Sequence, residues 1–550
     1  MLPLHRSGPI VREITQPVKL FAALDLMPTD LAKTCSRRLF SLSFEGRDGG
    51  VWMQNNASVN ARRKNPCATI RTANLTPMYI RPIALTLLPL ALIPSLVFRL
   101  NNQRHSEAAT PSETRSFPTN GVGTQLAATP PMGWNSWDSY GTTITEADFN
   151  SNAKWVAEHL KSFGWRYVII DMEWFVTNPT PEGNSKTSQY SLDDHGRYTP
   201  AVLRFPSSAN NAGFKSIADY VHSLGLKFGI HILRGIPKQA VEKNLPIEGS
   251  AYHAVDAADT SDTCPWNFDN YGVDAVKPAA QAYYDSIARL YASWDVDFIK
   301  VDCISSRPYK GDEIRMLSTA LRKTGRPIAL SLSPGAAPLE KVDEMRKYAQ
   351  AWRISDDVWD LWHSTVDYPQ GLGDQFPRIA KWAGLAQPGG WPDADMLPIG
   401  YLGPAPGWGK ARQTRLTHEE QRTLLTLWSM FRSPLMIGGN LPSNDEWTTS
   451  LLTNADVIEL DQHSKENRPV ISTSSTVVWT AQSESGDDKY VAIFNLDDHE
   501  QAVRYAWKDL GLQEAKYKAR DLWEHRDHEA AGSISVSLPP HGCALYRLSH

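Results

Sequence analysis

The amino-acid sequence predicts an α/β protein in which a (β/α)8 TIM barrel is followed by a C-terminal antiparallel β-sandwich domain. The chain has 550 residues, which allows roughly two to four domains and ample material for a buried core. From Pro131 onward, short β-branched or aromatic runs alternate with longer amphipathic stretches, as in repeated βα units. After about residue 468 the pattern changes to short alternating segments separated by polar stretches.

Eight runs are candidate strands of a barrel over residues 130–465, and amphipathic stretches lie between them. The candidate strands are 132–137, 167–174, 227–233, 297–303, 327–333, 351–357, a run near 384–391, and 433–439. In such a barrel the carboxyl ends of the strands and the loops after them form the active-site face. Four acidic residues should therefore lie on that face: Asp171, Asp302, Asp357 and Asp395.

Residues 466–550 are predicted to form the second folded domain. Their short alternating segments, such as 489–496 and 533–538, are typical of antiparallel strands with one buried face. We expect this domain to pack against the barrel, and sugar binding is the alternative role.

The front of the chain differs from the rest in charge. Residues 1–78 contain 11 Lys and Arg against 5 Asp and Glu, a net charge of +6, whereas the whole chain is at −4. Residues 1–77 are predicted to be a disordered basic extension, or sequence upstream of a true start at Met78. Residues 78–99 contain a 16-residue uncharged run and are predicted to be a signal sequence or an N-terminal membrane segment. Residues 100–129 have the composition of a linker.

This organisation predicts an exported protein, periplasmic or extracellular, which would be tethered to a membrane only if residues 78–99 stayed in the mature chain. The balanced charge argues against a nucleic-acid partner. Of the 19 tryptophans, 18 lie at or after Trp134. A tryptophan-rich, acidic body suits sugar binding, because a flat apolar ring can cover the C–H face of a sugar; core packing is the alternative interpretation.

The five cysteines do not form a recognisable metal-binding pattern. Their number is odd, their spacing is wide, and neither a Cys-x-x-Cys pair nor a Cys/His cluster occurs. Neither a structural zinc site nor a disulfide framework is therefore predicted. A single disulfide and five free thiols both remain compatible with the cysteine positions, which are Cys35, Cys67, Cys264, Cys303 and Cys543.

Two segments carry residues suited to glycoside hydrolysis. Lys300 and Asp302 are two apart on a predicted strand, so they face the same way, and the ammonium group favours an ionised, nucleophilic carboxylate. A structural ion pair is the alternative interpretation. Further on, Arg353 precedes Asp357 by four residues, and Asp357 adjoins Asp356, so one of the two acids is a candidate proton donor. Two carboxylates, one ionised and one protonated, are what a retaining glycosidase requires.

The order of the motifs along the chain resembles that of the glycoside hydrolase family 27 enzymes, the α-galactosidase (melibiase) group of clan D. The resemblance covers about residues 130–548 and is carried by segments 130–141, 167–174, 195–200, 298–303, 352–362, 388–400, 419–441, 454–462 and 538–548. It implies a catalytic barrel followed by an antiparallel β domain. It also implies a double-displacement mechanism with no metal and no organic cofactor.

The resemblance also implies roles for individual residues. Asp302 matches the nucleophile, and Asp357 matches the acid/base, in a pattern that includes Arg353, Asp360 and Trp362. Trp134 matches an aromatic residue under the sugar ring, and Asp171 matches a carboxylate that holds the hydroxyls at the non-reducing end. The remaining candidates for substrate binding are Met172, Lys300, Arg353, Trp391 and, at the pocket floor, Asp395.

The sequence departs from the family pattern in two places. Galactose-cleaving members carry a second acid after the one matching Asp171, and here that position is Met172. Losing a hydrogen bond to a charged group, worth about 1.5 to 3 kcal/mol, should reduce the preference for a sugar with a CH2OH arm by about tenfold to a hundredfold. Glu173 should face away and be a poor substitute. The second departure is at 333–335, where many members carry Cys-Glu-Trp; His231 and Arg234 are either replacement ligands or structural residues.

The sequence thus predicts a retaining exo-glycosidase acting on terminal α-galactosides through a covalent glycosyl-aspartate intermediate. The substrate would be a small or polymeric galactoside or arabinopyranoside. A β-L-arabinopyranosidase or another family 27 activity is the alternative, because Met172 replaces an acid and some members with an apolar residue there have this specificity. From a different class, a non-catalytic sugar-binding barrel remains an alternative.

Overall fold

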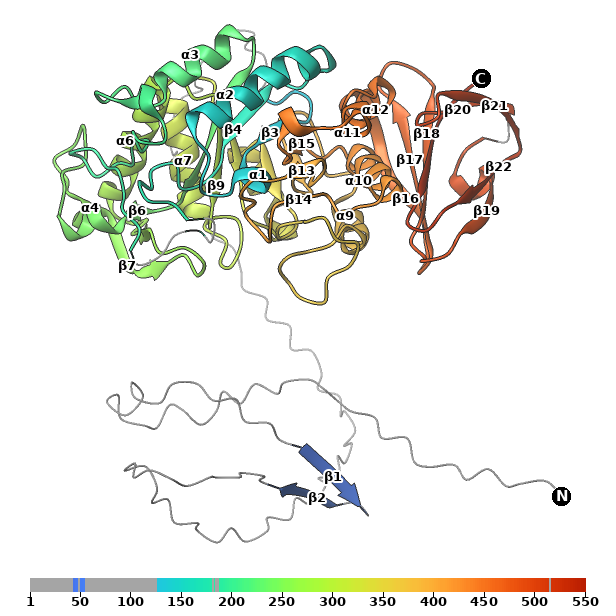
Figure 1. Ribbon diagram of the computed structural model, residues 1–550, viewed down its shortest axis with the longest axis horizontal. Coiled ribbons are helices and arrows are strands. Elements are labelled where there is room, and N and C mark those ends of the chain that lie inside the picture. The colour runs from blue at the N-terminus through green and yellow to red at the C-terminus, as the bar shows by residue number, and fades with distance from the viewer. Residues whose placement is uncertain (1–42, 48–49, 55–125, 181–182, 184–186, 514–515) are drawn as a thin grey trace, which may run out of the picture. The chain divides into compact units, whose positions relative to one another are not determined.

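A computed structural model describes residues 43–47, 50–54, 126–180, 183, 187–513 and 516–550 (Figure 1). The chain divides after residue 114 into two units, which we describe separately. In the first unit, strands β1 (Ser43–Arg47) and β2 (Gly50–Gln54) pair antiparallel. Most of residues 1–77, predicted to be a disordered basic extension, lie outside the described part of the chain, and that assignment stays a prediction. The predicted segment 78–99 and most of the linker lie outside the described residues. Among the residues that the structure does describe, no helix is long and apolar enough to cross a membrane.

The second unit begins with an eight-stranded parallel sheet, as predicted. The strands, in sheet order, are β12 (Trp391–Asp393), β11 (Ala351–Arg353), β10 (Ala329–Leu332), β9 (Phe298–Asp302), β5 (Lys227–Leu233), β4 (Tyr167–Ile170), β3 (Met132–Asn135) and β15 (Leu435–Ile437). Leu397, just after β12, closes the ring against β15. Its N–H donates to Met436 O over 2.8 Å, and its carbonyl accepts from the Gly438 N–H over 3.0 Å.

The seventh strand lies later in the chain than the sequence predicts. Residues 384–391 were the expected run, but β12 begins where that run ends. A tight turn occupies the predicted segment: the Gln387 and Gly390 backbones bond to each other, and Gly389 has a φ of 82°. The glycines of this segment therefore favour a turn, although its apolar residues predicted a strand.

Helices surround the barrel strands (Figure 1). Several begin with side-chain caps, among them the helices at Glu146–Trp155 and His418–Phe431. The Thr417 N–H donates to the Glu420 carboxylate over 2.8 Å, and the Glu420 N–H donates to Thr417 Oγ1 over 3.2 Å. Thr145 and Asp148 make the same pair of bonds. The helices are α1 (Trp137–Tyr140), α2 (Glu146–Trp155), α3 (Lys215–Ser223), α4 (Lys238–Glu242), α5 (Ala254–Ala257), α6 (Pro278–Ser293), α7 (Gly311–Lys323), α8 (Val342–Tyr348), α9 (Phe376–Trp382), α10 (His418–Phe431), α11 (Glu446–Leu452) and α12 (Ala455–His463).

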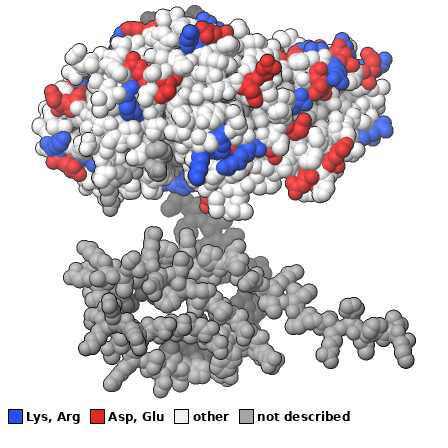
Figure 2. Space-filling model, in the orientation of Figure 1, with Lys and Arg blue, Asp and Glu red and all other residues white. Residues whose placement is uncertain are grey.

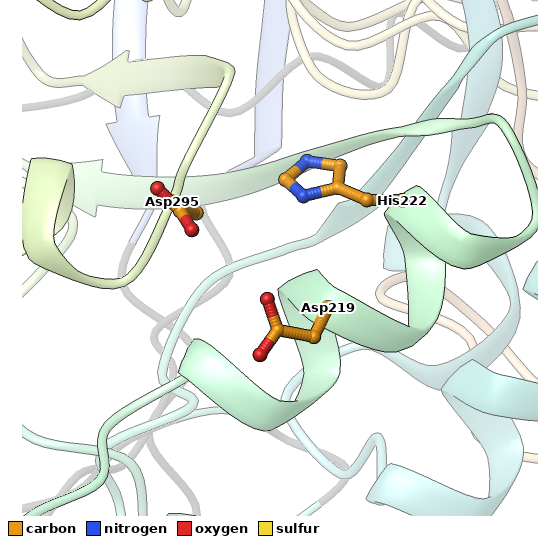
Figure 3. Close-up of side chains that lie close together, drawn as sticks. All are labelled: Asp219, His222 and Asp295. Carbon is orange, nitrogen blue, oxygen red and sulfur yellow. The ribbon is translucent and has the colours of Figure 1, made fainter.

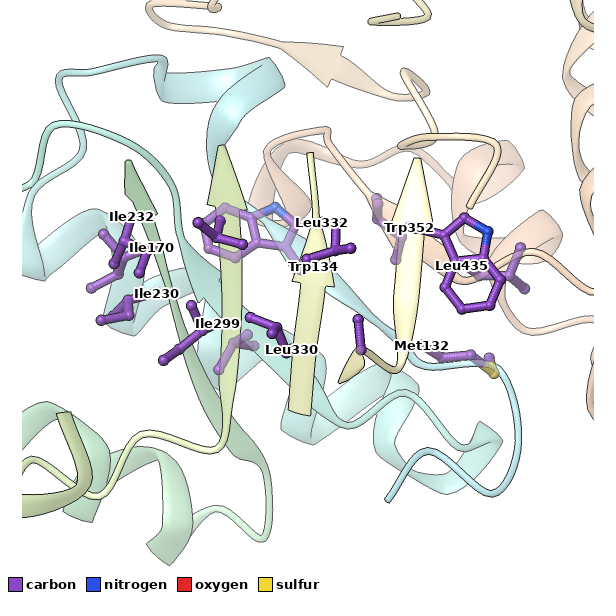
Figure 4. Close-up of a cluster of buried hydrophobic side chains, with 14 of the residues drawn as sticks. Met132, Trp134, Ile170, Ile230, Ile232, Ile299, Leu330, Leu332, Trp352 and Leu435 are labelled. Atoms are coloured by element: carbon purple, nitrogen blue, oxygen red, sulfur yellow. The ribbon is translucent and has the colours of Figure 1, made fainter. Parts of the chain in front are cut away.

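Alternation along the strands separates two groups of buried side chains. One group, which includes Met132, Trp134, Ile170, Ile299 and Trp352, packs with the core between strands and helices (Figure 4). The other consists of residues that alternate with these on the same strands, and it fills the barrel interior: Tyr167, Ile169, Phe298, Ala329, Met396 and Met436. On β9, Lys300 and Asp302 follow Phe298 at intervals of two, so both face the interior side.

Two smaller groups of strands extend the barrel. β6 (Ile236–Pro237), β7 (Ala258–Thr263) and β8 (Asn270–Val273) form a three-stranded antiparallel sheet in the segment between β5 and α6. β13 (Tyr401–Leu402) and β14 (Arg412–Gln413) form a two-stranded pair after β12. We call residues 234–277, which lie between β5 and α6 and contain the first of these groups, the inserted segment.

The C-terminal domain is antiparallel, as predicted, and begins at Ser464 rather than residue 466. Its larger sheet has the order β16 (Ser464–Ser472), β17 (Thr476–Ser483), β18 (Lys489–Asn495), β23 (Cys543–Ser549), β20 (Lys516–Asp521) and β21 (Arg526–Ala531). A second sheet consists of β19 (Gln501–Ala506) and β22 (Ser533–Leu538). A separate apolar cluster that includes Val491 and Trp507 fills this domain.

The β domain packs on the barrel through α10 and α12 (Figure 1). His541 stacks on Trp362 with 3.9 Å between ring centroids, and Phe376 contacts Phe494. The face shown in Figure 2 carries acidic and basic side chains interspersed over the described residues.

Arg432 connects the barrel with the β domain. It is 7% exposed, its Nε and Nη2 donate to the carbonyls of Asp461 and Gln462, and its Nη1 pairs with Glu484 over 2.8 Å. Its guanidinium also lies 5.0 Å from the ring centroid of Trp391.

Arg432→Met should lower the free energy of unfolding by about 3 to 5 kcal/mol, because it leaves buried carbonyl groups without a donor. Urea denaturation measures this. The matched control is Arg468→Met, since Arg468 is exposed and should tolerate the change within about 0.5 kcal/mol. Equal stability of the two variants would contradict the role of Arg432.

Candidate active site

A cavity of about 730 Å³ opens at the carboxyl ends of the barrel strands. Its volume falls in the range of sites for small organic ligands. The side chains around it come from loops after different strands, and they include Trp137, Asp171, Met172, Glu173, Trp266, Phe268, Lys300, Asp302, Arg307, Asp356, Asp357 and Tyr368. Both candidate catalytic carboxylates, Asp302 and Asp357, therefore border one space. A narrower space below, between the strands, is lined by Lys300, Arg353 and Asp395.

Asp302 is held ionised at the end of β9. Burial by itself raises the pKa of this carboxyl group, but the hydrogen bond to His231 and the charges of His231 and Lys300 outweigh it, so the pKa lies below its usual value. His231 Nε2 lies 3.3 Å from Oδ2, and the indole N–H of Trp266 donates to Oδ1 over 3.3 Å. An anionic carboxylate facing a cavity can act as a nucleophile.

Asp357 lies on the loop after β11 and stays accessible. Its side chain is 28% exposed, and Arg353 Nη2 donates to Oδ1 over 3.1 Å. The neighbouring Asp356 instead accepts from Arg307 Nη1 over 2.9 Å. The two adjacent acids thus pair with different arginines, Asp356 with Arg307 and Asp357 with Arg353. Only Asp357 of the two shares its cation, Arg353, with the buried Asp395 in the barrel interior.

Asp171 and Lys300 form a buried ion pair between β4 and β9. Lys300 Nζ donates to Asp171 Oδ2 over 2.9 Å, and Asn135 donates to the same oxygen over 2.7 Å. The Met172 N–H donates to Oδ1 over 2.9 Å. Burial alone raises the pKa of Asp171, but Lys300, His231 and the Met172 N–H together lower it well below its usual value. The sequence did not single out Asn135 as a site residue, although the alternation along β3 places it on the interior side of the barrel, opposite to Trp134.

Arg353 and Asp395 lie below the large cavity. Arg353 is 2% exposed, and its Nη1 pairs with Asp395 Oδ1 over 2.7 Å. Asp395 Oδ2 accepts from the Val358 N–H over 2.7 Å, next to Asp357. Burial raises the pKa of Asp395, the charge of Arg353 opposes this, and Asp357 adds to the rise. The pair holds the Asp357 loop against the barrel interior, and a direct sugar contact by Arg353 stays a prediction.

Two of the predicted sugar-binding tryptophans do not reach the cavity. Trp134 is fully buried in the core between strands and helices, and its indole N–H donates to Gly439 O over 2.8 Å. Trp391 is also fully buried, and its indole N–H donates to Ala127 O over 2.7 Å. Alternation turns Trp134 away from the interior, and Trp391 is the first residue of its strand, at the end opposite the cavity. Trp137 lines the cavity instead.

Met172 borders the cavity beside Asp171, but the prediction that Glu173 faces away is wrong. Glu173 has a φ of 62°, which breaks the alternation of the preceding strand. It is 2% exposed, borders the same cavity, and accepts from Asn267 Nδ2 over 3.3 Å. Glu173 thus forms a hydrogen bond with the inserted segment, through Asn267.

One disulfide joins the inserted segment between β5 and α6 to the chain beside Asp302. Cys264 is bonded to Cys303, the residue after Asp302, so a single bridge is present among the described cysteines, and Cys543 is free. Arg234 is a structural residue: it is 3% exposed and pairs with Asp262 and Glu313, each over 2.8 Å. His231 contacts Asp302 and does not line the cavity.

One cluster in the described part of the chain has ligands suited to a metal ion. Asp219, His222 and Asp295 bring side-chain atoms within 4.8 Å of one another (Figure 3). Lys215 pairs with both carboxylates, and Arg326 Nη1 holds Asp295 over 2.8 Å. These cations already neutralise the carboxylates, so the residues fit an ion-pair network better than a metal site. None of the three lines the catalytic cavity.

The chain is similar to known carbohydrate-active proteins over both domains. The family model described as "Alpha galactosidase A" matches residues 267–463, and the "Alpha galactosidase C-terminal beta sandwich domain" matches residues 473–548. An α-galactosidase from Cyamopsis tetragonoloba is 30% identical over 454 residues, covering 82% of this chain and 92% of that protein.

Two bacterial structures are more similar in sequence. A GH27 β-L-arabinopyranosidase from Geobacillus stearothermophilus is 47% identical with a TM-score of 0.75, covering 78% of this chain and 97% of that one. A putative α-N-acetylgalactosaminidase from Bacillus halodurans is 42% identical with a TM-score of 0.68, covering 76% and 97%.

A barrel with carboxylates around a cavity at its carboxyl-end face, followed by a β sandwich, defines this protein as a glycoside hydrolase. The α-galactosidase from Cyamopsis tetragonoloba and the two bacterial structures are all described as glycosidases. The chain belongs to glycoside hydrolase family 27, as its motifs predicted.

His231→Leu should move the acidic limb of the kcat/KM profile to higher pH. The variant removes the hydrogen bond that lowers the pKa of Asp302, so the nucleophile becomes protonated at a higher pH. A pH series of kcat/KM measures this. His222→Leu is the control, because His222 pairs with Asp297 over 2.7 Å outside the cavity. An unshifted limb in His231→Leu would refute the role of the hydrogen bond.

Proposed function

We propose that the protein is a retaining exo-glycosidase with a preference for terminal β-L-arabinopyranosides. The observation that carries the specificity is Met172, an apolar side chain that borders the cavity directly beside the buried anion Asp171. Asp302 is the nucleophile and Asp357 is the acid/base. Asp171, Lys300 and Arg353 are the charged groups that would hold sugar hydroxyls.

The reaction takes two steps. An Asp302 oxygen attacks the anomeric carbon as the bond to the leaving oxygen breaks, and Asp357 gives its proton to that oxygen. Water then attacks the anomeric carbon of the glycosyl-aspartate, Asp357 takes a proton from the water, and the carboxylate of Asp302 is released. The lowered pKa of Asp302 keeps it anionic for the first step. The accessibility of Asp357 suits proton exchange with leaving group and water.

The apolar Met172 favours a pentose over a hexose. β-L-Arabinopyranose shares the ring stereochemistry of galactose but lacks the CH2OH arm, so it loses nothing beside a thioether. A galactoside would bury a hydroxyl there without the charged acceptor found in galactose-cleaving members, at a loss of about 1.5 to 3 kcal/mol. The 47% identity to an arabinopyranosidase supports the same preference.

Hydrolysis of α-galactosides is the second candidate. The curated relatives from Cyamopsis tetragonoloba and Coffea arabica are α-galactosidases that are each 30% identical to this chain. The two substrates share their ring stereochemistry, so the residues around the arm, above all Met172, would separate them.

The specificity is tested with p-nitrophenyl β-L-arabinopyranoside and p-nitrophenyl α-galactoside. We expect kcat/KM to favour the pentoside by more than about tenfold. Met172→Asp should reverse part of this preference, because it supplies an acceptor for the arm, and Met172→Leu is the matched control. A parent protein that prefers the galactoside would establish the second candidate instead.

The catalytic pair is tested with Asp302→Ala and Asp357→Ala. Each change should lower kcat by about 10⁴-fold or more. Added azide should rescue both, giving a glycosyl azide of inverted configuration with Asp302→Ala and of retained configuration with Asp357→Ala, because only the latter forms the covalent intermediate.

The control is Asp356→Ala, which changes the neighbouring carboxylate and should give no azide product. Full activity of either catalytic variant would refute the assignment. A parent chain that binds the sugars without hydrolysing them would establish the non-catalytic alternative.

A further inference from the structure

Exposed aromatic side chains gather at the mouth of the catalytic cavity. In the described part of the chain, the large aromatic side chains with the greatest exposure are Tyr252, Trp266, Phe268 and Tyr368, at 39%, 40%, 53% and 46%. The last three line the catalytic cavity. Apolar groups concentrated around one opening mark a binding surface rather than chance exposure.

Trp266 is fixed beside the nucleophile. Its indole N–H donates to Asp302 Oδ1 over 3.3 Å, and the disulfide at Cys264 anchors the chain two residues earlier. The guanidinium of Arg307 lies 5.6 Å from the ring centroid, and Arg307 in turn pairs with Asp356. One face of the indole is thus braced by a cation, while the ring as a whole stays 40% exposed.

Tyr368 is a second aromatic residue that lines the catalytic cavity. Burial raises the pKa of its hydroxyl, and the charge of Asp357 is the next largest cause, followed by Asp138 and Asp395. Tyr368 itself is 46% exposed. Trp266 and Tyr368 thus border the same cavity as Asp302 and Asp357.

Phe268 extends this surface away from the carboxylates. It lines both the catalytic cavity and an adjoining hollow of about 350 Å³, whose other walls include Tyr190, Lys238 and Glu242. The polar groups that would hold the reacting sugar, Asp171 and Lys300, are buried deeper. The aromatic residues therefore lie at the opening of the cavity, where the leaving group of a bound glycoside would extend outward.

We propose that Trp266, Phe268 and Tyr368 form a leaving-group subsite for a group with a flat apolar face. This inference rests on the proposed function and adds to it the class of leaving group. The C–H face of a second pyranose ring and the face of an aromatic ring both offer this chemistry. Stacking on such a side chain is worth about a tenfold change in kcat/KM.

The test compares three glycosides of the same sugar, with methyl, p-nitrophenyl and pyranosyl leaving groups, in the full chain. Phe268→Ala should lower kcat/KM for at least one flat leaving group relative to the methyl glycoside by about tenfold. A loss confined to the p-nitrophenyl glycoside identifies an aryl leaving group, and a loss confined to the disaccharide identifies a sugar. Tyr368→Ala should change the ratios in the same direction.

Tyr252→Ala is the control, because Tyr252 is equally exposed but does not line the cavity, and its ratios should match the parent. Unchanged ratios in both Phe268→Ala and Tyr368→Ala would overturn the subsite. A parent that cleaves none of the three glycosides would refute the proposed function instead. In that case calorimetry with the p-nitrophenyl glycoside decides, and equal affinity of Phe268→Ala and the parent would overturn the subsite.

Discussion

The ion pair between Lys300 and Asp171 is the constraint on which the site depends. Both side chains are withdrawn from solvent, at 15% and 2% exposure, and a charge in that position is tolerated only with a partner and further hydrogen bonds. Asn135 and the Met172 N–H supply those bonds to Asp171. The charge of Lys300 also acts on Asp302, which lowers the pKa of that carboxyl group. Lys300 thus stabilises the anionic form of two carboxylates at the barrel mouth, Asp171 and Asp302.

A second cation organises the opposite side of the site in the same way. Arg353 pairs with buried Asp395 and also donates to Asp357, and Asp395 accepts from the backbone beside Asp357. Four acids, Asp171 and Asp302 on one side and Asp357 and Asp395 on the other, are therefore divided between two cations that come from different strands. This division leaves Asp302 with hydrogen-bond donors around it and Asp357 open to the cavity, so the two carboxylates are not equivalent.

Much of this could be predicted from the sequence. Strand runs ending in acids placed Asp171, Asp302 and Asp357 at one end of a barrel, and the two-residue spacing of Lys300 and Asp302 put both on one face. Prediction failed where the local pattern did not carry the direction of a side chain. Trp134 and Trp137 are both in one short motif, and only the register of β3 tells which of them faces the helices. The positive φ of Glu173 likewise has no counterpart in composition or spacing.

The sequence by itself determined the barrel and the β domain, because these follow from periodicity. The family and the candidate carboxylates came from the resemblance of its motifs, which are residues close together along the chain, to those of family 27. Only the tertiary structure decided which residues surround those carboxylates. His231, Trp266 and Asp302 come from three separate segments, and a disulfide between Cys264 and Cys303 brings the inserted one to the nucleophile. The physical reason is that contacts between distant segments depend on how the strands and loops pack, and neither hydrophobic period nor residue spacing encodes that packing.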